Sequence, residues 1–114
     1  MANISPRTLL RRDVFFIDAS LPDLFTLTSA LSADAEIHFI DSTQDGFEQI
    51  ALTLRGLQGE SDIDAIHIFS HGSAGEISIG STTLSNYNIN SYAATLSQIG
   101  SALSPAGDIL LYGC

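Results

Sequence analysis

Two apolar runs of this chain each lead into a reactive side chain beside a glycine. They read Ile66-His67-Ile68-Phe69-Ser70-His71-Gly72 and Ile109-Leu110-Leu111-Tyr112-Gly113-Cys114. If both runs are neighbouring parallel strands, His71 and Cys114 emerge at the same edge of the sheet. A thiol attacks as its thiolate, and a nearby histidine helps to form the thiolate and later protonates the leaving group. The pair therefore predicts a cysteine nucleophile with a histidine base.

Gly72 and Gly113 favour this interpretation because a backbone without a Cβ lets a substrate approach closely. We expect the amide groups of Gly72 and Cys114 to point at a developing oxyanion. The structural alternatives are a buried core cysteine, a residue type that is often fully buried, and a loop histidine bonded to the backbone. Composition and spacing leave both readings open.

The elements that must position this pair follow from the hydrophobic pattern. The expected strands are 14–17, 36–40, 63–69 and 108–112, with a hairpin of 76–79 and 82–84 around Gly80-Ser81. The expected helices are 21–32, capped by Ser20; one that opens at 43–46 and ends at Gly56; and one from Tyr92 to Leu103, closed by 104–107. This order predicts an α/β fold, a three-layer sandwich with a mainly parallel sheet between helices. We expect a flexible arm over 1–12 and one domain over 13–114.

The charge of the chain excludes several kinds of partner. Thirteen acidic residues oppose four arginines, for a formal net charge of −9. Such a surface repels phosphate backbones and anionic lipids, so we expect no nucleic-acid binding. We expect no membrane insertion, since no stretch approaches the roughly twenty apolar residues needed to span a bilayer. The single cysteine excludes an internal disulfide.

The remaining histidines carry a weaker signal. His38 and His67 lie inside predicted strands and are interpreted as hydrogen-bonded core residues. A zinc site of His67, His71 and Cys114 lacks the short paired spacings of metal ligands. The sequence therefore predicts no metal and no cofactor.

Three aspartates at strand ends or helix starts have a structural explanation. Asp18, Asp41 and Asp45 are expected to cap helix N-termini. A polar contact from Asp18 or Asp41 to the candidate site is the alternative, because both follow predicted strands.

In this order, the Ser-His-Gly and Gly-Cys motifs resemble those of the caspase-like peptidases of clan CD. More specifically, the chain from about residue 13 resembles a domain of unknown function found near the N-terminus of very large bacterial surface proteins and adhesins with cadherin-like or calcium-binding repeats. The segments that carry this resemblance are Phe15-Phe16-Ile17-Asp18, Asp45-Gly46-Phe47-Glu48-Gln49-Ile50, His67-Ile68-Phe69-Ser70-His71-Gly72, Gly75-Glu76-Ile77-Ser78-Ile79-Gly80 and Leu110-Leu111-Tyr112-Gly113-Cys114.

The resemblance implies a caspase-like, Rossmann-like topology with His71 as general base and acid and Cys114 as nucleophile. It places the oxyanion hole at Gly72 and the Cys114 amide. Relatives continue past the cysteine, so we expect a fold truncated after its fourth core strand and weak or absent peptidase activity of this piece alone. A carboxylate beside the thiol would also disfavour the thiolate.

The leading expectation for function is a caspase-like cysteine peptidase module of a secreted or cell-surface bacterial protein. Its partners would be a peptide or protein substrate, its own chain included, and the downstream repeat domains. Since no classical signal peptide is visible, the protein would be cytoplasmic before export. The alternative is a non-catalytic structural or export module of an adhesin. A small-molecule-binding doubly wound domain ranks third, because no phosphate-binding motif is present.

Overall fold

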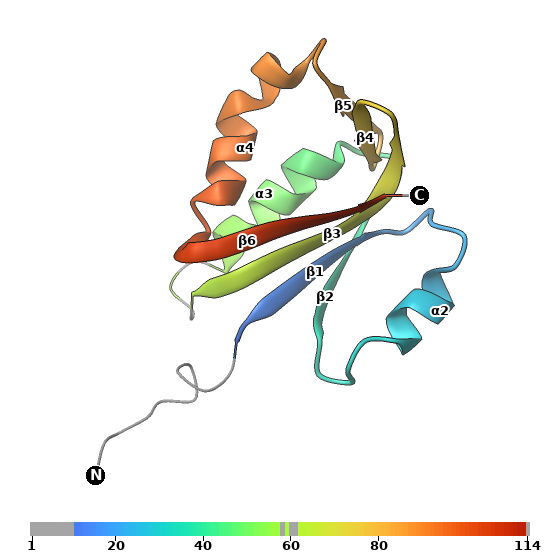
Figure 1. Cartoon of the computed structure of the whole chain (residues 1–114), viewed down its shortest axis with the longest axis vertical. Coiled ribbons are helices and arrows are strands. Elements are labelled where there is room, and N and C mark those ends of the chain that lie inside the picture. Colours follow the sequence, from blue (N-terminus) through green and yellow to red (C-terminus); the bar gives the residue numbers. More distant parts are fainter. Residues whose placement is uncertain (1–10, 58, 60–61, 114) are drawn as a thin grey trace.

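The computed structural model describes residues 11–57, 59 and 62–113, and within them it forms an α/β fold (Figure 1). The strands are β1 (Asp13–Asp18), β2 (Glu36–Ile40), β3 (Ile63–Ser73), β4 (Glu76–Ile79), β5 (Thr82–Ser85) and β6 (Leu103–Gly113). The helices are α2 (Leu24–Ser29), α3 (Gly46–Gly56), the 3-10 turn η1 (Ile89–Tyr92) and α4 (Ala93–Gly100). Among the described residues there are thus three α-helices and six strands, in the order that the hydrophobic pattern predicts.

The six described strands form one mixed sheet that is partly parallel. Its main path is β2-β1-β3-β4-β5, and β6 pairs with β3 beside this path. The strands β1, β2, β3 and β6 are parallel, whereas β4 and β5 pair antiparallel to their neighbours. Parallel pairing brings the carboxyl ends of β1, β3 and β6 to the same edge of the sheet.

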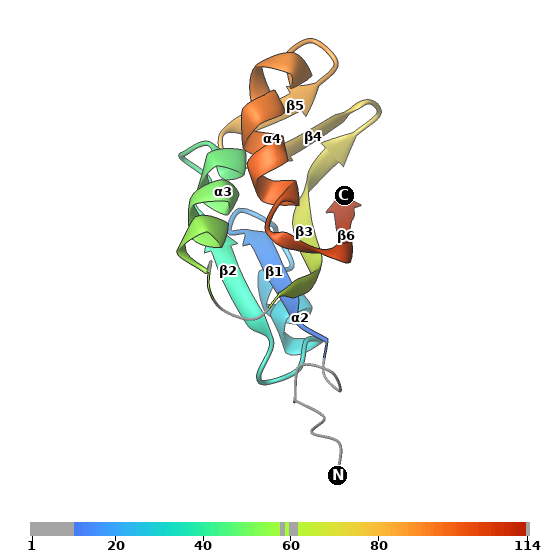
Figure 2. The ribbon, with the colours of Figure 1, turned by 90° about the vertical axis from the view of Figure 1, so that its left-hand side faces the viewer.

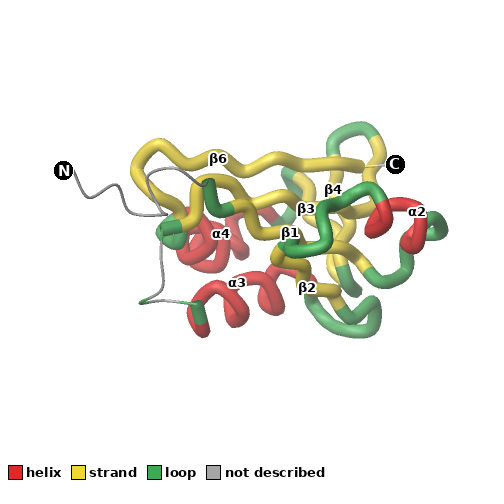
Figure 3. The backbone as a smooth tube through the Cα atoms, turned by 90° about the horizontal axis from the view of Figure 1, so that it is seen from below, coloured by secondary structure: helices red, strands yellow, loops and turns green. Residues whose placement is uncertain are grey.

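One face of the sheet packs on α3 and α4 to form the core. The buried stripe of α3 contains Phe47, Ile50, Ala51 and Leu54, at helical spacing. These side chains form one cluster with Val14 and Phe16 of β1, Ile66 and Ile68 of β3, and Ile99 of α4. Figures 2 and 3 show α3 and α4 on the same side of the strands. This layer of helices packs against β1 and β3 and so fixes the strands that lead to the candidate sheet edge.

The opposite face is covered more sparsely. The short helix α2 lies on that side and buries none of its residues (Figure 2). At the edge of the sheet, β6 pairs only with β3 among the described strands, and its Ile109, Leu110 and Leu111 are 42%, 37% and 53% exposed. An apolar edge strand of this kind is a template for pairing with another strand.

Several predicted boundaries were wrong because tertiary pairing overrides local signals. The first helix begins at Leu24 rather than near Leu21, its N-cap is Asp23, and Ser20 bonds elsewhere. The predicted closing turn 104–107 instead belongs to β6, which pairs from Leu103 onward with a register irregularity opposite Ile63 and Ala65. The chain before α4 forms the 3-10 turn η1.

The predicted N-terminal arm falls mostly outside the described residues. Arg12 stands at the end of this predicted arm. Its guanidinium donates from Nε and Nη2 to the Glu36 carboxylate at 3.0 and 2.8 Å, and the backbone amide of Arg12 donates to Asp64 at 2.7 Å. Arg12 is therefore joined to β2 and to the start of β3. No helix of the described residues is long and apolar enough to cross a membrane.

Candidate functional site

The carboxyl ends of β3 and β6 lie side by side. Ser70 of β3 pairs with Gly113 of β6 in the parallel register, so the next residue of β3 is His71 and the next residue of the chain after β6 is Cys114. A Cβ on Gly113 would lie 3.5 Å from the Cα of Gly72, and a Cβ on Gly72 would lie 3.6 Å from the Cα of Gly113. Cys114 itself lies outside the described residues, so its roles as nucleophile and amide donor stay predictions.

His71 and Gly72 belong to β3, which extends beyond the 63–69 that the sequence pattern predicted and so rules out the alternative of a loop histidine. The hairpin strand β4 pairs with the end of β3, matching His71 with Ser78 and Gly72 with Ile77. This pairing extends β3 beyond its apolar run, because backbone hydrogen bonds satisfy a strand whatever its side chains are. The His71 imidazole thus extends from a strand whose backbone is paired with β4.

The His71 ring is held by Ser20, which lies two residues after the end of β1. The Ser20 hydroxyl lies 2.9 Å from Nε2 of His71 and 2.6 Å from Oδ1 of Asp18. Asp18 is 1% exposed and also accepts from the amides of Ser20 at 2.8 Å and Gly80 at 2.9 Å. Asp18, Ser20 and His71 therefore form a continuous polar chain, which we call the Asp18 relay.

The environment of Asp18 keeps its carboxyl ionised. Burial by itself raises its pKa, but hydrogen bonds from the Ser20 side chain and from the Ser20 and Gly80 amides act the other way, as does the nearby His71. The balance lowers the pKa of Asp18 below its ordinary value. The relay accordingly ends in a buried negative charge.

Sequence reasoning assigned Ser20 to a helix cap and left Asp18 with two readings. The structure favours the second reading, a polar contact from Asp18 to the site, which runs through Ser20. A usable signal was present: Asp18 ends a predicted strand, and the carboxyl ends of parallel strands converge at one edge. What the sequence did not provide was the adjacency of β1 and β3.

Of the other two predicted helix caps, Asp45 is confirmed and Asp41 is wrong. Asp45 caps α3, since its Oδ1 accepts from the amides of Phe47 and Glu48 at 3.0 and 3.1 Å. Asp41 caps no helix; it accepts from the amide and hydroxyl of Thr43 in a local turn. These bonds lower the pKa of Asp41.

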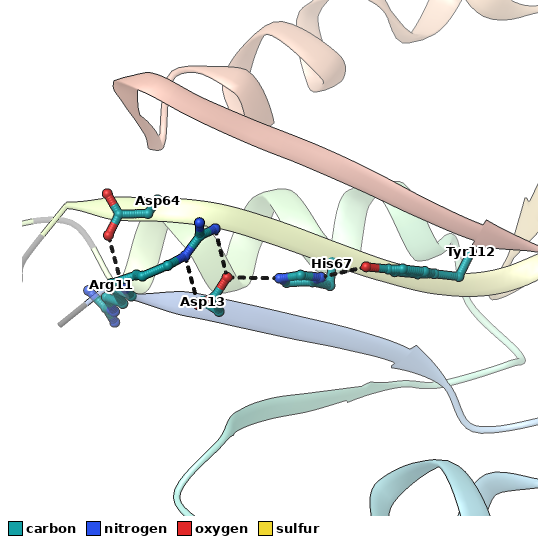
Figure 4. A network of polar contacts seen from close by, with 6 residues as sticks. Arg11, Asp13, Asp64, His67 and Tyr112 are labelled. Atoms are coloured by element: carbon teal, nitrogen blue, oxygen red, sulfur yellow. Dashed lines mark hydrogen bonds and ion pairs between the residues drawn. The ribbon is translucent and has the colours of Figure 1, made fainter. Parts of the chain in front are cut away.

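His67 lies in a second polar network, on the sheet face away from α3 (Figure 4). Its Nε2 is 2.9 Å from Oδ1 of Asp13 and its Nδ1 is 2.9 Å from the hydroxyl of Tyr112. The ring also stacks on Phe15, with centroids 4.3 Å apart. His67 is thus the hydrogen-bonded histidine that the sequence predicted, and it links β1, β3 and β6.

This network fixes the end of β6. Tyr112 precedes Gly113, and its ring stacks on Phe69 of β3 with centroids 4.3 Å apart in addition to the bond with His67. The strand that leads to Cys114 is therefore held against β3 by a side chain as well as by its backbone ladder.

His38 does not match its prediction. Its Nε2 is buried and has no hydrogen-bond partner among the described residues; the nearest carboxylate oxygen, on Glu36, is 3.9 Å away. The ring instead stacks on Phe16, with centroids 5.4 Å apart. Apolar packing, not hydrogen bonding, accounts for this histidine.

In the described part of the chain, no three His, Asp or Glu side chains gather as metal ligands would. What the strand ends do bring together is an oriented imidazole, a buried carboxylate behind it and a glycine-lined backbone. These are the parts from which general acid–base chemistry is built.

Comparison with known protein families gives a match over most of the chain. A family described as a domain of unknown function, DUF4347, matches residues 14–114. No curated protein and no solved structure matches the chain.

Proposed function

The chain belongs to the DUF4347 family, and for this domain we propose the activity of a cysteine peptidase, with Cys114 as nucleophile and His71 as its general base and acid. The amides of Gly72 and Cys114 form its oxyanion hole. The fold is caspase-like, and the reaction is hydrolysis of a peptide bond.

The observation that carries the proposal is the register of β3 and β6. Because Ser70 pairs with Gly113 in the parallel register, the next residues along the chain, His71 and Cys114, each follow one of two adjacent strand positions. Adjacent parallel strands lie about 4.8 Å apart, which is within the reach of two short side chains. Gly72 and Gly113 lie next to each other at this edge, and neither carries a Cβ that would obstruct an approaching substrate backbone.

The chemistry proceeds in two halves. The Cys114 thiol gives its proton to His71, and the thiolate attacks the carbonyl carbon of the scissile bond. Collapse of the oxyanion breaks the C–N bond while His71 protonates the leaving amine. Water, deprotonated by His71, then hydrolyses the thioester and restores the thiol.

The sequence resemblance supports the biological setting of this proposal. We place the domain in a large bacterial surface or secreted protein, exported without a classical signal peptide and followed by repeat domains. A peptide or protein, including another part of the same chain, is the substrate. The formal charge of −9 is compatible with a surface that stays clear of nucleic acid and anionic lipid.

The test uses the full-length protein and an irreversible peptide probe that alkylates thiols. We expect labelling at Cys114 that Cys114→Ala abolishes. His71→Ala should slow labelling about 100-fold or more, since a positioned general base contributes roughly 10²–10⁴-fold. His38→Ala is the matched control and should label at the wild-type rate, because His38 lies on β2 and contacts Phe16 rather than the site.

Circular dichroism of each variant separates loss of chemistry from loss of fold. Labelling of Cys114 that survives His71→Ala would contradict the dyad. If the wild-type protein and the His71→Ala variant are both folded but neither is labelled at Cys114, the result would favour the non-catalytic structural module instead.

A further inference from the structure

We infer that Asp18 and Ser20 are positioning residues that hold His71 as the tautomer protonated on Nε2, leaving Nδ1 as the basic nitrogen of the site. This assignment deepens the proposed function and rests on it for its catalytic meaning. The proton arrangement itself depends only on described residues.

Few protons are available to the hydrogen bonds of the Asp18 relay. The Ser20 hydroxyl has one proton and two neighbours, Oδ1 of Asp18 at 2.6 Å and Nε2 of His71 at 2.9 Å. An ionised carboxylate accepts hydrogen bonds and donates none. If Ser20 donated to His71, two oxygens would face each other at 2.6 Å without a proton between them.

The shorter distance shows where the hydroxyl proton lies. Bonds from a hydroxyl to a carboxylate are about 2.5–2.7 Å long and roughly twice as strong as neutral ones. Ser20 therefore donates to Asp18, and its oxygen accepts from Nε2–H of His71. A neutral imidazole carries one proton, so Nδ1 keeps its lone pair.

The Asp18 carboxylate, at the start of this chain of hydrogen bonds, is itself held in one orientation. The Ser20 amide donates to the same Oδ1 as the Ser20 hydroxyl, while the Gly80 amide donates to Oδ2. Asp18 is buried, and its lowered pKa keeps it charged at neutral pH. Both its oxygens are occupied, so the carboxylate has one orientation and imposes one on Ser20.

The same geometry excludes Ser20 as the nucleophile of a serine hydrolase. A nucleophilic serine gives its proton to the histidine, whereas Ser20 directs its proton to Asp18 and accepts from His71. Ser20 thus acts through His71, and the lone pair of Nδ1 is left for the proton of the Cys114 thiol.

The test has a spectroscopic arm and a kinetic arm, both on the full-length protein. The ring ¹⁵N shifts of His71, assigned by their loss in His71→Ala, report which nitrogen carries the proton in the neutral ring. We expect Nε2–H in the wild type. Ser20→Ala should shift the ring nitrogens toward a mixture, and Ser20→Thr, which retains the hydroxyl, should restore the wild-type shifts.

In the kinetic arm, Cys114 alkylation should slow about tenfold in Ser20→Ala, roughly the factor that one hydrogen bond is worth, and recover in Ser20→Thr. An Nδ1–H signal in the wild type would overturn the inference, as would Ser20→Ala shifts identical to the wild type. If His71 is Nε2–H but Cys114 is inert, the peptidase proposal fails and the tautomer assignment stands. Peptidase activity that depends on Ser20 and not on Cys114 would overturn both.

Discussion

Two buried or half-buried aspartates show how the same residue type takes different roles at this sheet edge. Asp18 accepts from a loop serine and from Gly80, whereas Asp45 accepts from the first turn of α3 and, through Oδ2, from the hydroxyl of Tyr92 at 2.6 Å. The bond with Asp45 is the main reason that the pKa of Tyr92 is raised, since ionised tyrosine would lose it and face a like charge.

At the residue scale, Asp45→Ala should lower the free energy of unfolding by about 2 kcal/mol, because both the helix cap and the Tyr92 bond are lost. Asp23→Ala is the matched control: Asp23 is the N-cap of α2 but makes no capping hydrogen bond with its side chain. Chemical denaturation of both variants gives the comparison. Equal losses would show that the side-chain bonds of Asp45 do not stabilise the fold.

The β4–β5 hairpin packs its turn against the start of α3. Gly80 has φ +63° and forms an isolated bridge with Asp45, and a Cβ there would collide with the Gln44 carbonyl and with the backbone of Gly46. This contact also delivers the Gly80 amide to Asp18. The turn is thus coupled to the Asp18 relay through the backbone of Gly80, a position that tolerates no side chain.

At the element scale, Gly80→Ala should destabilise the fold far more than Gly75→Ala. Gly75 has φ +79° but nothing within 4 Å of an added Cβ, so alanine there costs about 1 kcal/mol of backbone strain. Gly80→Ala adds a steric collision worth a further 1–3 kcal/mol, roughly. Thermal melts of the two variants measure the difference, and similar melting temperatures would rule out the close packing of turn and helix.

For the whole molecule, carboxylates tie together three of the described parallel strands, β1, β2 and β3. The Arg12 hydrogen bond lowers the pKa of Glu36, with burial opposing it. For Asp13, burial raises the pKa, but hydrogen bonds with His67 and Arg11 outweigh it and leave the pKa below its ordinary value. Asp18 is lowered in the same direction.

These directions set the expected pH dependence of stability. Each folded-state pKa lies below the unfolded value of about 4, so the folded state binds fewer protons. The stabilisation is present above about pH 4 and is lost as the pH falls through the folded-state values. Denaturant midpoints of the wild type, measured from about pH 5 to about pH 3, should fall steeply. The fall should be smaller in Asp18→Asn. The control Asp34→Asn, at an exposed position, should behave as the wild type does. A midpoint that rises throughout acidification would mean that relief of the net negative charge dominates.

The hydrophobic pattern of the sequence determined the element order, the α/β class and the convergence of the His71 and Gly113 strand ends. These depend on local periodicity and on the rule that parallel strands expose their carboxyl ends at one edge. The cap at Asp45 was also predictable, because an N-cap is a bond between residues close in sequence.

Only the tertiary structure determined which side chains join His71. The bonds from Ser20 to His71 and from Gly80 to Asp18 span 51 and 62 positions of sequence, so no local pattern encodes them. The strand state of His71 has the same origin, since it arises from pairing with β4. The sequence by itself indicated the two candidate residues and the sheet edge at which β3 and β6 end, whereas the packing of β1 and the hairpin beside β3 decided the orientation of the histidine.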